Sequence, residues 1–421
     1  MIGTLYRLAT SAAEPLAPLL LRVRLWRSKA DEARLDEKLG RGRGVRPEGR
    51  LIWLHGASVG ESLSVLPLVE RIAAGGNHVM VTTGTKTSAA VLGRRLPEGC
   101  FHQYVPLDGP RAVARFLNRW APDAALWVES ELWPNLLAET RRRGIPTALV
   151  NGRMSPRSFA RWRRMPSLAS TMVGRFSVVL AQSEADGARL TALGARNVTF
   201  AGDLKAAAMP LEADAEALAR VRDAIGERPT WLAVSTHDGE ERLVAEVHRQ
   251  IANAMPDLLT VIVPRHVDRG DAIETELTDR GFRVVRRSRN ELPGPSTQVF
   301  LGDSMGEMGL YLRLGNPVLV GKSLLHEGGH NPREPALLGR AVLFGPHMEN
   351  FQTATEALLA AGGAVQIADH DTLGLIVGRL LGDPEAARQI GDRARARAEA
   401  DAAGILDATF EALAPVLQGT V

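Results

Sequence analysis

A single cysteine, Cys100, occurs among the 421 residues of the chain. An intrachain disulfide is therefore excluded, and a metal site built from cysteine thiolates is nearly excluded. The scarcity of cysteine fits a protein body that lies in the reducing cytoplasm. Cys100 has no obvious base beside it in the sequence, so we expect a buried or incidental thiol and not a nucleophile.

A long uncharged apolar run is also missing. Residues 1–21 are largely apolar, but Arg7 and Glu14 interrupt them, and basic residues follow at Arg22, Arg24, Arg27 and Lys29. A spanning helix needs about 18 or more apolar residues without charges. A cleaved signal sequence would carry its basic residues before the apolar core, which is the reverse of the order here. We therefore predict that residues 1–28 associate with a membrane surface. The alternative is an amphipathic helix that packs on the protein itself.

Acidic residues are absent between Thr140 and Ser183, although the net charge of the whole chain is only +3. The arginines of this stretch are Arg141, Arg142, Arg143, Arg153, Arg157, Arg161, Arg163, Arg164 and Arg175. Such a run is often a solvated surface, but a one-sided excess favours an anionic partner. No helix-turn-helix, zinc-finger or RNP pattern supports nucleic acid. A phosphorylated lipid is the better candidate.

Short β-branched runs alternate with helical patterns along both halves of the chain. In the first half they occupy residues 51–55, 78–82, 124–128, 145–150 and 177–181, and in the second half residues 231–235, 258–264, 282–285, 298–301, 317–320 and 341–344. Buried parallel strands joined by helical crossovers have this pattern. The sequence therefore predicts an α/β fold with two Rossmann-like, doubly wound parallel sheets that face a central cleft. We expect the domains to cover residues 29–207 and 208–421.

A glycine-rich turn at residues 56–60 follows the first predicted strand and leads to Glu61 at the start of a helical pattern. A Walker phosphate loop would need a lysine where Glu61 stands, so ATP binding is disfavoured. Two interpretations of Glu61 stay open. The carboxylate either stabilises the helix dipole or acts as a general base at the mouth of the cleft.

Two more carboxylates, Glu129 and Glu131, follow the predicted strand 124–128, and we expect at most one of them to face the cleft. Lys205 lies at the domain junction. A lone lysine is usually solvated, but this position suits contact with a negatively charged donor.

The second half offers polar residues at three expected strand or loop ends. Pro264 and Arg265 end one strand, and Gly306, Glu307 and Met308 open a helix whose backbone amides can hold a phosphate. A loop follows at Asn331, Pro332, Arg333 and Glu334, and Glu334 could accept two ribose hydroxyls. The histidines at 237, 266, 326, 330 and 347 match no zinc spacing, so we expect polar loop residues and no metal.

Several of these segments carry a resemblance to a known family when they are taken in order. They are residues 55–61 (HGASVGE), 129–135 (ESELWPN), 264–266 (PRH), 305–307 (MGE), 328–334 (GGHNPRE), and 345–347 (GPH) with 350–351 (NF). Together they resemble the 3-deoxy-D-manno-octulosonic acid (Kdo) transferases of lipopolysaccharide assembly, a metal-independent GT-B glycosyltransferase family. The resemblance extends from the N-terminal apolar segment to about Phe351.

The resemblance implies an inverting transfer of Kdo from CMP-Kdo to the 6′-hydroxyl of lipid IVA, a lipid A precursor. It implies Glu61 as the general base, with Glu129 and Lys205 supporting the transition state. It also implies that residues 29–207 bind the acceptor and residues 208–421 bind the donor, with no cofactor. The residues that would hold CMP are Pro264, Arg265, Gly306, Glu307, Met308, Asn331, Pro332, Arg333 and Glu334. The expected location is the cytoplasmic side of the cell inner membrane, on its anionic leaflet.

Two rival interpretations stay open. One is a UDP-hexose transferase of the same architecture. The other is a non-enzymatic, nucleotide-sensing membrane adaptor, which would not need a carboxylate beside the glycine turn at the mouth of the cleft.

Overall fold

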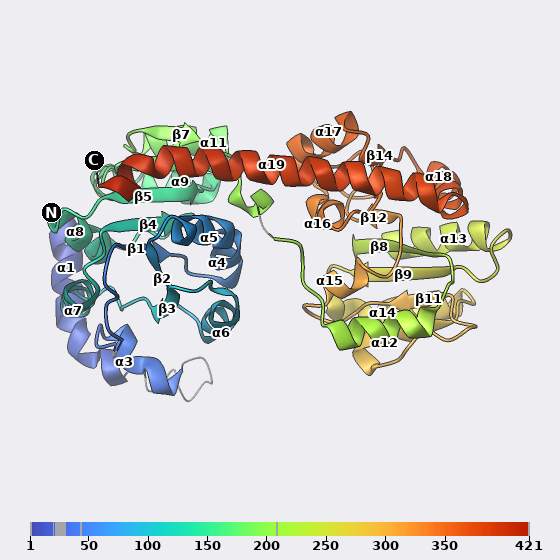
Figure 1. Cartoon of the computed structure of the whole chain (residues 1–421), viewed down its shortest axis with the longest axis horizontal. Helices are drawn as coiled ribbons and strands as arrows, with labels where there is room; N and C mark the ends of the chain where they lie inside the picture. Colours follow the sequence, from blue (N-terminus) through green and yellow to red (C-terminus); the bar gives the residue numbers. More distant parts are fainter. Residues whose placement is uncertain (1, 20, 22–30, 43, 208, 420–421) are drawn as a thin grey trace. The chain divides into compact units, whose positions relative to one another are not determined.

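The structure is a computed structural model that describes residues 2–19, 21, 31–42, 44–207 and 209–419. It divides into two compact units (Figure 1). Unit 1 comprises Met1–Ala208 and Ala402–Val421, and unit 2 comprises Met209–Asp401. The cleft between the two sheets stays a prediction.

Unit 1 is built on a seven-stranded sheet in which all neighbouring strands are parallel. The strands are β1 (Leu51–His55), β2 (His78–Thr83), β3 (Cys100–Tyr104), β4 (Ala124–Val128), β5 (Thr147–Gly152), β6 (Val178–Ala181) and β7 (Val198–Phe200), in the order β3-β2-β1-β4-β5-β6-β7. Its longer helices are α1 (Ile2–Ala13), α5 (Leu66–Ala74), α6 (Lys86–Arg95), α7 (Pro110–Trp120), α8 (Pro134–Arg142), α10 (Pro166–Val173) and α11 (Glu184–Ala192). Shorter ones are α3 (Leu35–Lys38), α4 (Val59–Ser64), α9 (Pro156–Trp162) and the 3₁₀ turn η3 (Leu204–Ala207).

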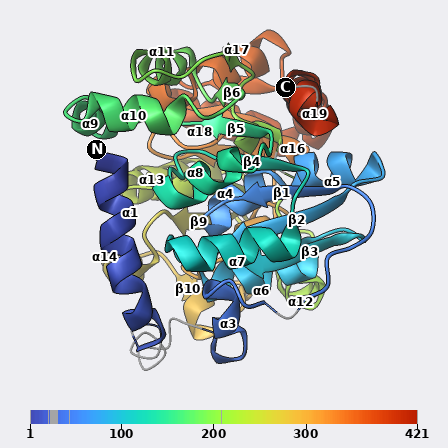
Figure 2. The same cartoon turned by 90° about the vertical axis from the view of Figure 1, so that its left-hand side faces the viewer.

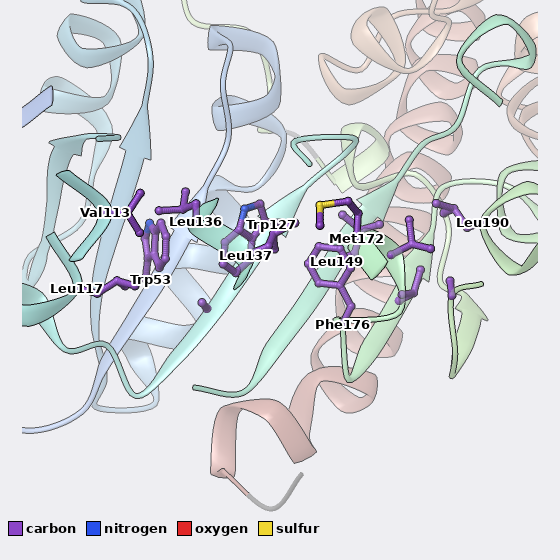
Figure 3. Close-up of a cluster of buried hydrophobic side chains, with 14 of the residues drawn as sticks. Trp53, Val113, Leu117, Trp127, Leu136, Leu137, Leu149, Met172, Phe176 and Leu190 are labelled. Atoms are coloured by element: carbon purple, nitrogen blue, oxygen red, sulfur yellow. The ribbon is translucent and has the colours of Figure 1, made fainter. Parts of the chain in front are cut away.

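Both faces of this sheet are covered, which explains why its strands read as continuous apolar runs. Leu51 and Trp53 of β1 pack into one core cluster, whereas Ile52 and Leu54 pack into another on the opposite face. Figure 3 shows the first cluster, in which Trp53 and Trp127 lie with ring centroids 4.9 Å apart. Full burial of each such side chain contributes roughly 1.5–3 kcal/mol.

Unit 2 contains a second seven-stranded parallel sheet. Its strands are β8 (Thr230–Thr236), β9 (Leu259–Pro264), β10 (Val284–Arg286), β11 (Val299–Leu301), β12 (Val318–Val320), β13 (Val342–Phe344) and β14 (Ala364–Gln366), in the order β10-β11-β9-β8-β12-β13-β14. Its helices are α12 (Ala215–Ile225), α13 (Glu240–Ala252), α14 (Gly270–Asp279), α15 (Met308–Tyr311), α16 (Arg333–Leu337), α17 (Gln352–Ala360), α18 (His370–Gly382) and the first part of α19 (Pro384–Gln418). The prediction of two doubly wound parallel sheets is confirmed.

The last helix differs from the predicted domain division, which assigned all of residues 208–421 to the second domain. Residues 402–418, the last part of α19, belong to unit 1. Leu413 and Val416 are fully buried in the second core cluster of unit 1, and Arg71 of α5 forms an ion pair with Asp407. The apolar stripe of these last turns is buried against unit 1, so the chain returns to the unit in which it began.

The N-terminal helix α1 packs against α7 and α8 (Figure 2). The Tyr6 hydroxyl donates to Asp108 at 3.0 Å, and Glu14 accepts the backbone N–H of Ala112, in the first turn of α7, at 2.6 Å. Leu5 and Leu8 remain 63% and 62% exposed. The helix thus packs on the protein and also presents leucines to the outside. Of the predicted basic edge, residues 22–29 lie outside the described part of the chain. None of the described helices is both long enough and apolar enough to cross a membrane.

Each sheet has a point where the strand order reverses. In unit 1 it lies between β1 and β4, and in unit 2 between β8 and β12. Ligands of open α/β sheets bind beyond the carboxyl ends of the strands at such points. The residues that follow these four strands are therefore the first place to look for a site.

Candidate active site

Glu61 follows β1 and lies in the first turn of α4, whose N-terminal cap is Ser58. The Ser58 hydroxyl accepts the Glu61 N–H at 3.2 Å and donates to Glu61 Oε1 at 2.8 Å. Glu61 Oε2 accepts the Ala57 N–H at 2.8 Å. These contacts resemble a capping box, so the helix-stabilising interpretation has a structural basis. The same contacts hold the carboxylate in one orientation, and a methyl group built on the neighbouring Gly60 would meet nothing within 4 Å. The backbone beside Glu61 is therefore open to close approach by another molecule.

Glu129 and Lys205 form an ion pair in which Lys205 Nζ donates to Glu129 Oε1 at 2.6 Å. The Glu129 side chain is 13% exposed and that of Lys205 is 43% exposed. Glu129 has a φ of 57°, a conformation that costs a non-glycine residue about 1–3 kcal/mol and that often occurs at functional sites. Two of the three predicted catalytic residues are thus in direct contact.

Glu131 also belongs to this group, and sequence reasoning missed it. Glu131 accepts the Trp133 indole N–H at 2.7 Å. Burial raises the pKa of Glu131, and the charges of Glu61 and Glu129 raise it further. The expectation that at most one of Glu129 and Glu131 faces the cleft stays a prediction. Both residues lie beyond the end of β4, and the positive φ of Glu129 breaks the strand geometry there, so strand alternation does not set the directions of their side chains.

His55, the last residue of β1, lies near Glu131 and is almost fully buried. Its Nδ1 is 3.2 Å from the Thr82 carbonyl oxygen, so Nδ1 carries the proton and donates. Its Nε2 is buried without a hydrogen-bond partner and is 3.8 Å from Glu131 Oε2. Burial lowers the pKa of His55 to about 4. The neutral imidazole therefore presents an acceptor nitrogen toward Glu131.

In unit 2, the structure brings together two of the predicted nucleotide-binding segments. Arg265 follows β9, and its N–H donates to the Thr236 carbonyl of the neighbouring β8 at 3.0 Å. Pro332 is the N-terminal cap residue of α16, and Asn331 donates to Glu334 at 3.3 Å. Burial raises the pKa of Glu334, whereas the Asn331 hydrogen bond and the charge of Arg265 lower it.

The third predicted nucleotide-binding segment is Gly306, Glu307 and Met308, and its carboxylate is already paired within the protein. The Glu307 carboxylate accepts two hydrogen bonds from Arg287, at 3.0 and 2.6 Å. Arg287 and Ser304 lower the pKa of Glu307. Gly306 precedes it at a φ of 81°, and Met308 begins the short α15. This segment follows β11, which pairs with β9, so it lies at the same sheet edge, with its carboxylate held by Arg287. The last of the predicted residues, Arg333, forms an ion pair with Asp401 of α19, in which Arg333 Nη2 lies 3.7 Å from Asp401 Oδ2.

A histidine cluster at the same edge was also missed. His237 follows β8, and its Nε2 is 2.9 Å from Nε2 of His330. The rings of His266 and His326 lie 5.7 and 5.9 Å from the His237 ring. The sequence analysis predicted polar loop residues at these positions. Their clustering could not be predicted, because it depends on the order of β9, β8 and β12 in the sheet, which brings their loops together. Among the described residues, no group of three or more His, Cys, Asp or Glu side chains could hold a metal ion.

Comparison with known proteins gives consistent matches. Residues 33–208 match a family model described as 3-deoxy-D-manno-octulosonic-acid transferase (kdotransferase). The 3-deoxy-D-manno-octulosonic acid transferase of Haemophilus influenzae is 34% identical over 85% of this chain and 86% of its own length. The protein of the same name from Bordetella pertussis is 34% identical over 88% of each chain.

A solved structure supports the fold. A glycosyltransferase from Rickettsia africae superposes with a TM-score of 0.59, covering 88% of this chain and 100% of its own, at 10% identity. At that identity the likeness concerns the fold alone, and the predicted GT-B architecture is confirmed to that extent.

Proposed function

The chain belongs to the 3-deoxy-D-manno-octulosonic acid (Kdo) transferase family and is a glycosyltransferase, and we propose that it moves Kdo from CMP-Kdo to the 6′-hydroxyl of lipid IVA in lipopolysaccharide biosynthesis. The transfer inverts the anomeric configuration, and Glu61 is the general base. The observation that carries this proposal is that α4, which bears Glu61, contacts η3, which bears Lys205, and that Lys205 pairs with Glu129 at the reversal of the unit 1 sheet.

Glycosyl transfer to an alcohol requires a base and a nearby positive charge. An alcohol is a poor nucleophile at neutral pH, so its proton must pass to a base as the new bond to the anomeric carbon forms. The bond from that carbon to the phosphate breaks, and CMP leaves with the electron pair. Glu61 receives the proton in this proposal. Lys205, oriented by Glu129, supplies positive charge where negative charge develops. No step asks for a metal ion.

The donor is assigned to unit 2. Arg265 supplies charge for the phosphate or the Kdo carboxylate. Glu334, held by Asn331 at 3.3 Å, accepts from the ribose hydroxyls. The remaining residues assigned to CMP are Pro264, Gly306, Glu307, Met308, Pro332 and Arg333. Glu307 then contributes through its backbone, because its carboxylate is already paired with Arg287.

The acceptor is assigned to unit 1, where a cavity of about 390 Å³ lies between α1, α7, α8 and α10. Arg7, Arg142 and Arg175 line it together with Glu139, which pairs with Arg142, and with apolar groups such as Val113 and Met172. A lipid that carries phosphates and acyl chains matches this mixture of positive charge and apolar surface. The acid-free arginine stretch continues on α9, where Arg157 and Arg161 are exposed.

Association with the cytoplasmic leaflet of the inner membrane is part of the proposal. Leu5 and Leu8 of α1 and Leu16 and Leu19 beyond it are each about 60% exposed. Exposed leucines near a basic surface favour an interfacial position on an anionic leaflet.

The direct test is to incubate the purified full chain with CMP-Kdo and lipid IVA and to analyse the lipid by mass spectrometry. We expect Kdo-bearing lipid and released CMP, with the inverted anomer seen by NMR. UDP-hexose in place of CMP-Kdo should give no transfer. Transfer from UDP-hexose would favour the hexose-transferase alternative, and CMP binding without transfer would favour a nucleotide-binding adaptor.

A further inference from the structure

Four histidines gather at the carboxyl edge of the unit 2 sheet, with His237 at their centre. His237 and His330 stack with centroids 5.1 Å apart and planes inclined by 19°, and their Nε2 atoms are 2.9 Å apart. At that distance one imidazole donates and the other accepts. His326 is fixed separately, because its Nε2 donates to the Asp238 carbonyl oxygen at 2.8 Å.

Positive charge dominates the surroundings of this pair. Burial, together with the positive charges of His237, Arg265, Lys322 and His266, lowers the pKa of His330 to about 4. The pKa of His237 is lowered by burial and by the charges of Lys322 and other histidines, against the opposing effect of Glu240. An anion here would remove this repulsion.

The carboxylates of the region are already engaged with protein groups. Glu240 is 2% exposed and accepts the backbone N–H groups of His237 at 2.9 Å, Lys322 at 2.8 Å and Ser323 at 3.2 Å. Asp238 pairs with Arg269 at 2.8 Å. One oxygen of Glu334 accepts from Asn331. None of these carboxylates accepts a hydrogen bond from the imidazole of His237 or His330.

Two non-glycine residues near the pair have positive φ values. They are Ser235, near the end of β8, and Lys322, just after β12, with φ values of 55° and 58°. Gly328 has a φ of 108°, and a methyl group there would lie 2.5 Å from the Asn350 amide nitrogen and 3.4 Å from Lys322 Nζ. The positive φ and the approach to Asn350 favour glycine at this position. Positive φ values of non-glycine residues, as at Ser235 and Lys322, often occur at ligand sites.

We propose that His237 and His330, together with Lys322 and Arg265, form a binding site for a phosphate monoester that takes up a proton when the anion binds. The 2.9 Å contact already holds one proton, so the added proton goes to the other ring nitrogen of the imidazole that donates. The two rings then share the positive charge across the contact, and the phosphate dianion balances the cations. This inference rests on the proposed function only for the identity of the phosphate monoester, which is CMP.

The pH dependence follows from linkage. An anion favours the charged imidazolium, so binding raises the pKa of the pair above the value in the free protein. Affinity must therefore increase as the pH falls from the pKa of the complex toward that of the free protein. Where one proton is taken up, the dissociation constant changes by about tenfold per pH unit. Below pH ~6 the phosphate itself gains a proton and the gain is lost.

The experiment is calorimetry of CMP binding to the full chain at pH 7.5 and above, in buffers of low and high ionisation enthalpy. We expect net uptake approaching about one proton per CMP, and none with cytidine, which lacks the phosphate. His330→Asn and His237→Asn should abolish the uptake and weaken CMP binding. His370→Asn is the matched control, because His370 is exposed at the start of α18 and contacts Asp371 at 3.1 Å.

A second measurement keeps the test independent of variants that fold poorly. The imidazole resonances of the unaltered protein are followed by NMR from pH 4 to 9 with CMP, with inorganic phosphate, or with neither. The proposal would be overturned if CMP bound with the same heat in all buffers and the imidazole titration did not change when CMP was added. That result would leave the proposed function intact. Failure of CMP to bind, with inorganic phosphate still raising the histidine pKa values, would overturn the assigned donor and retain the anion site.

Discussion

Lys205 Nζ lies 2.6 Å from Glu129 Oε1, across 76 positions of sequence. The pair joins the residue after β4 to the η3 turn that ends the first segment of unit 1. Because Lys205 is 43% exposed, the pair contributes only about 0–1 kcal/mol to stability. Its position beside Glu61 and Glu131 is better explained by the chemistry of the site.

Replacement of Lys205 separates these two roles. We expect Lys205→Ala to lower kcat on the order of 10²-fold, as for loss of one electrostatic contact to the transition state, with almost no change in Tm. Arg220→Ala breaks a more exposed pair with Glu216 on α12 and serves as the control. Steady-state kinetics and thermal unfolding check both. A large fall in Tm with unchanged kcat would make the pair structural.

Replacement of Glu61 tests the general base. We expect Glu61→Gln to retain the fold and CMP affinity while kcat falls by about 10²–10⁴-fold. Ser58→Ala removes the N-terminal cap but keeps the carboxylate. It should lower the unfolding free energy by about 1 kcal/mol and reduce kcat much less than Glu61→Gln does. Near-normal turnover of folded Glu61→Gln would assign the base role to Glu129.

Glu131 gives a pH-dependent stability effect. Its pKa is raised in the folded state from 4.5 by burial, so the native protein binds more protons than the unfolded chain above that pH. Stability must then fall as the pH rises from about 4.5 through the folded pKa. Glu131→Gln removes this titration, and its amide can donate toward the unpartnered His55 Nε2. We expect the unfolding free energy of the unaltered protein to decline relative to Glu131→Gln over that range, measured by urea unfolding. Parallel dependence of the two unfolding free energies on pH would contradict a raised pKa of Glu131 in the folded protein.

The donor site is tested in unit 2. Arg265→Ala and Glu334→Ala should each raise the KM for CMP-Kdo or abolish turnover, because both remove groups assigned to the nucleotide. Arg289→Ala is the control, since Arg289 pairs with Glu274 on the surface at 2.7 Å. EDTA should leave the activity of the unaltered protein unchanged, and activity lost in EDTA and restored by Mg²⁺ would show that the reaction needs a metal.

Membrane association is tested on α1. Removal of residues 1–28 should weaken binding to anionic vesicles, and salt should weaken it further. Because α1 packs on α7 and α8, a gentler variant is the pair Leu5→Ser and Leu8→Ser, whose side chains are already exposed. Leu375→Ser, with Leu375 75% exposed on α18, is the control in a flotation assay. Binding that resists truncation and salt alike would contradict a peripheral attachment.

Local sequence was sufficient for most of the two sheets. Runs such as 124–128 and 342–344 are apolar throughout, because helices cover both faces of each sheet, and they were predicted. The strands that were not predicted lack that signal. β3 reads Cys-Phe-His-Gln-Tyr, and the three-residue β7 leaves Phe200 55% exposed. β14 is also only three residues long. These edge strands form because a neighbouring strand supplies the hydrogen bonds.

The sequence by itself determined which polar residues follow the strands, since glycine turns and strand ends are local features. Only the tertiary structure decided which of them meet. Parallel strand order brings His237 to His330 across 93 positions and Lys205 to Glu129 across 76. The positive φ of Glu129, which places its carboxylate beside Lys205, is likewise a product of packing. Contacts between residues so far apart depend on the order of the strands in the sheet, which no local pattern encodes.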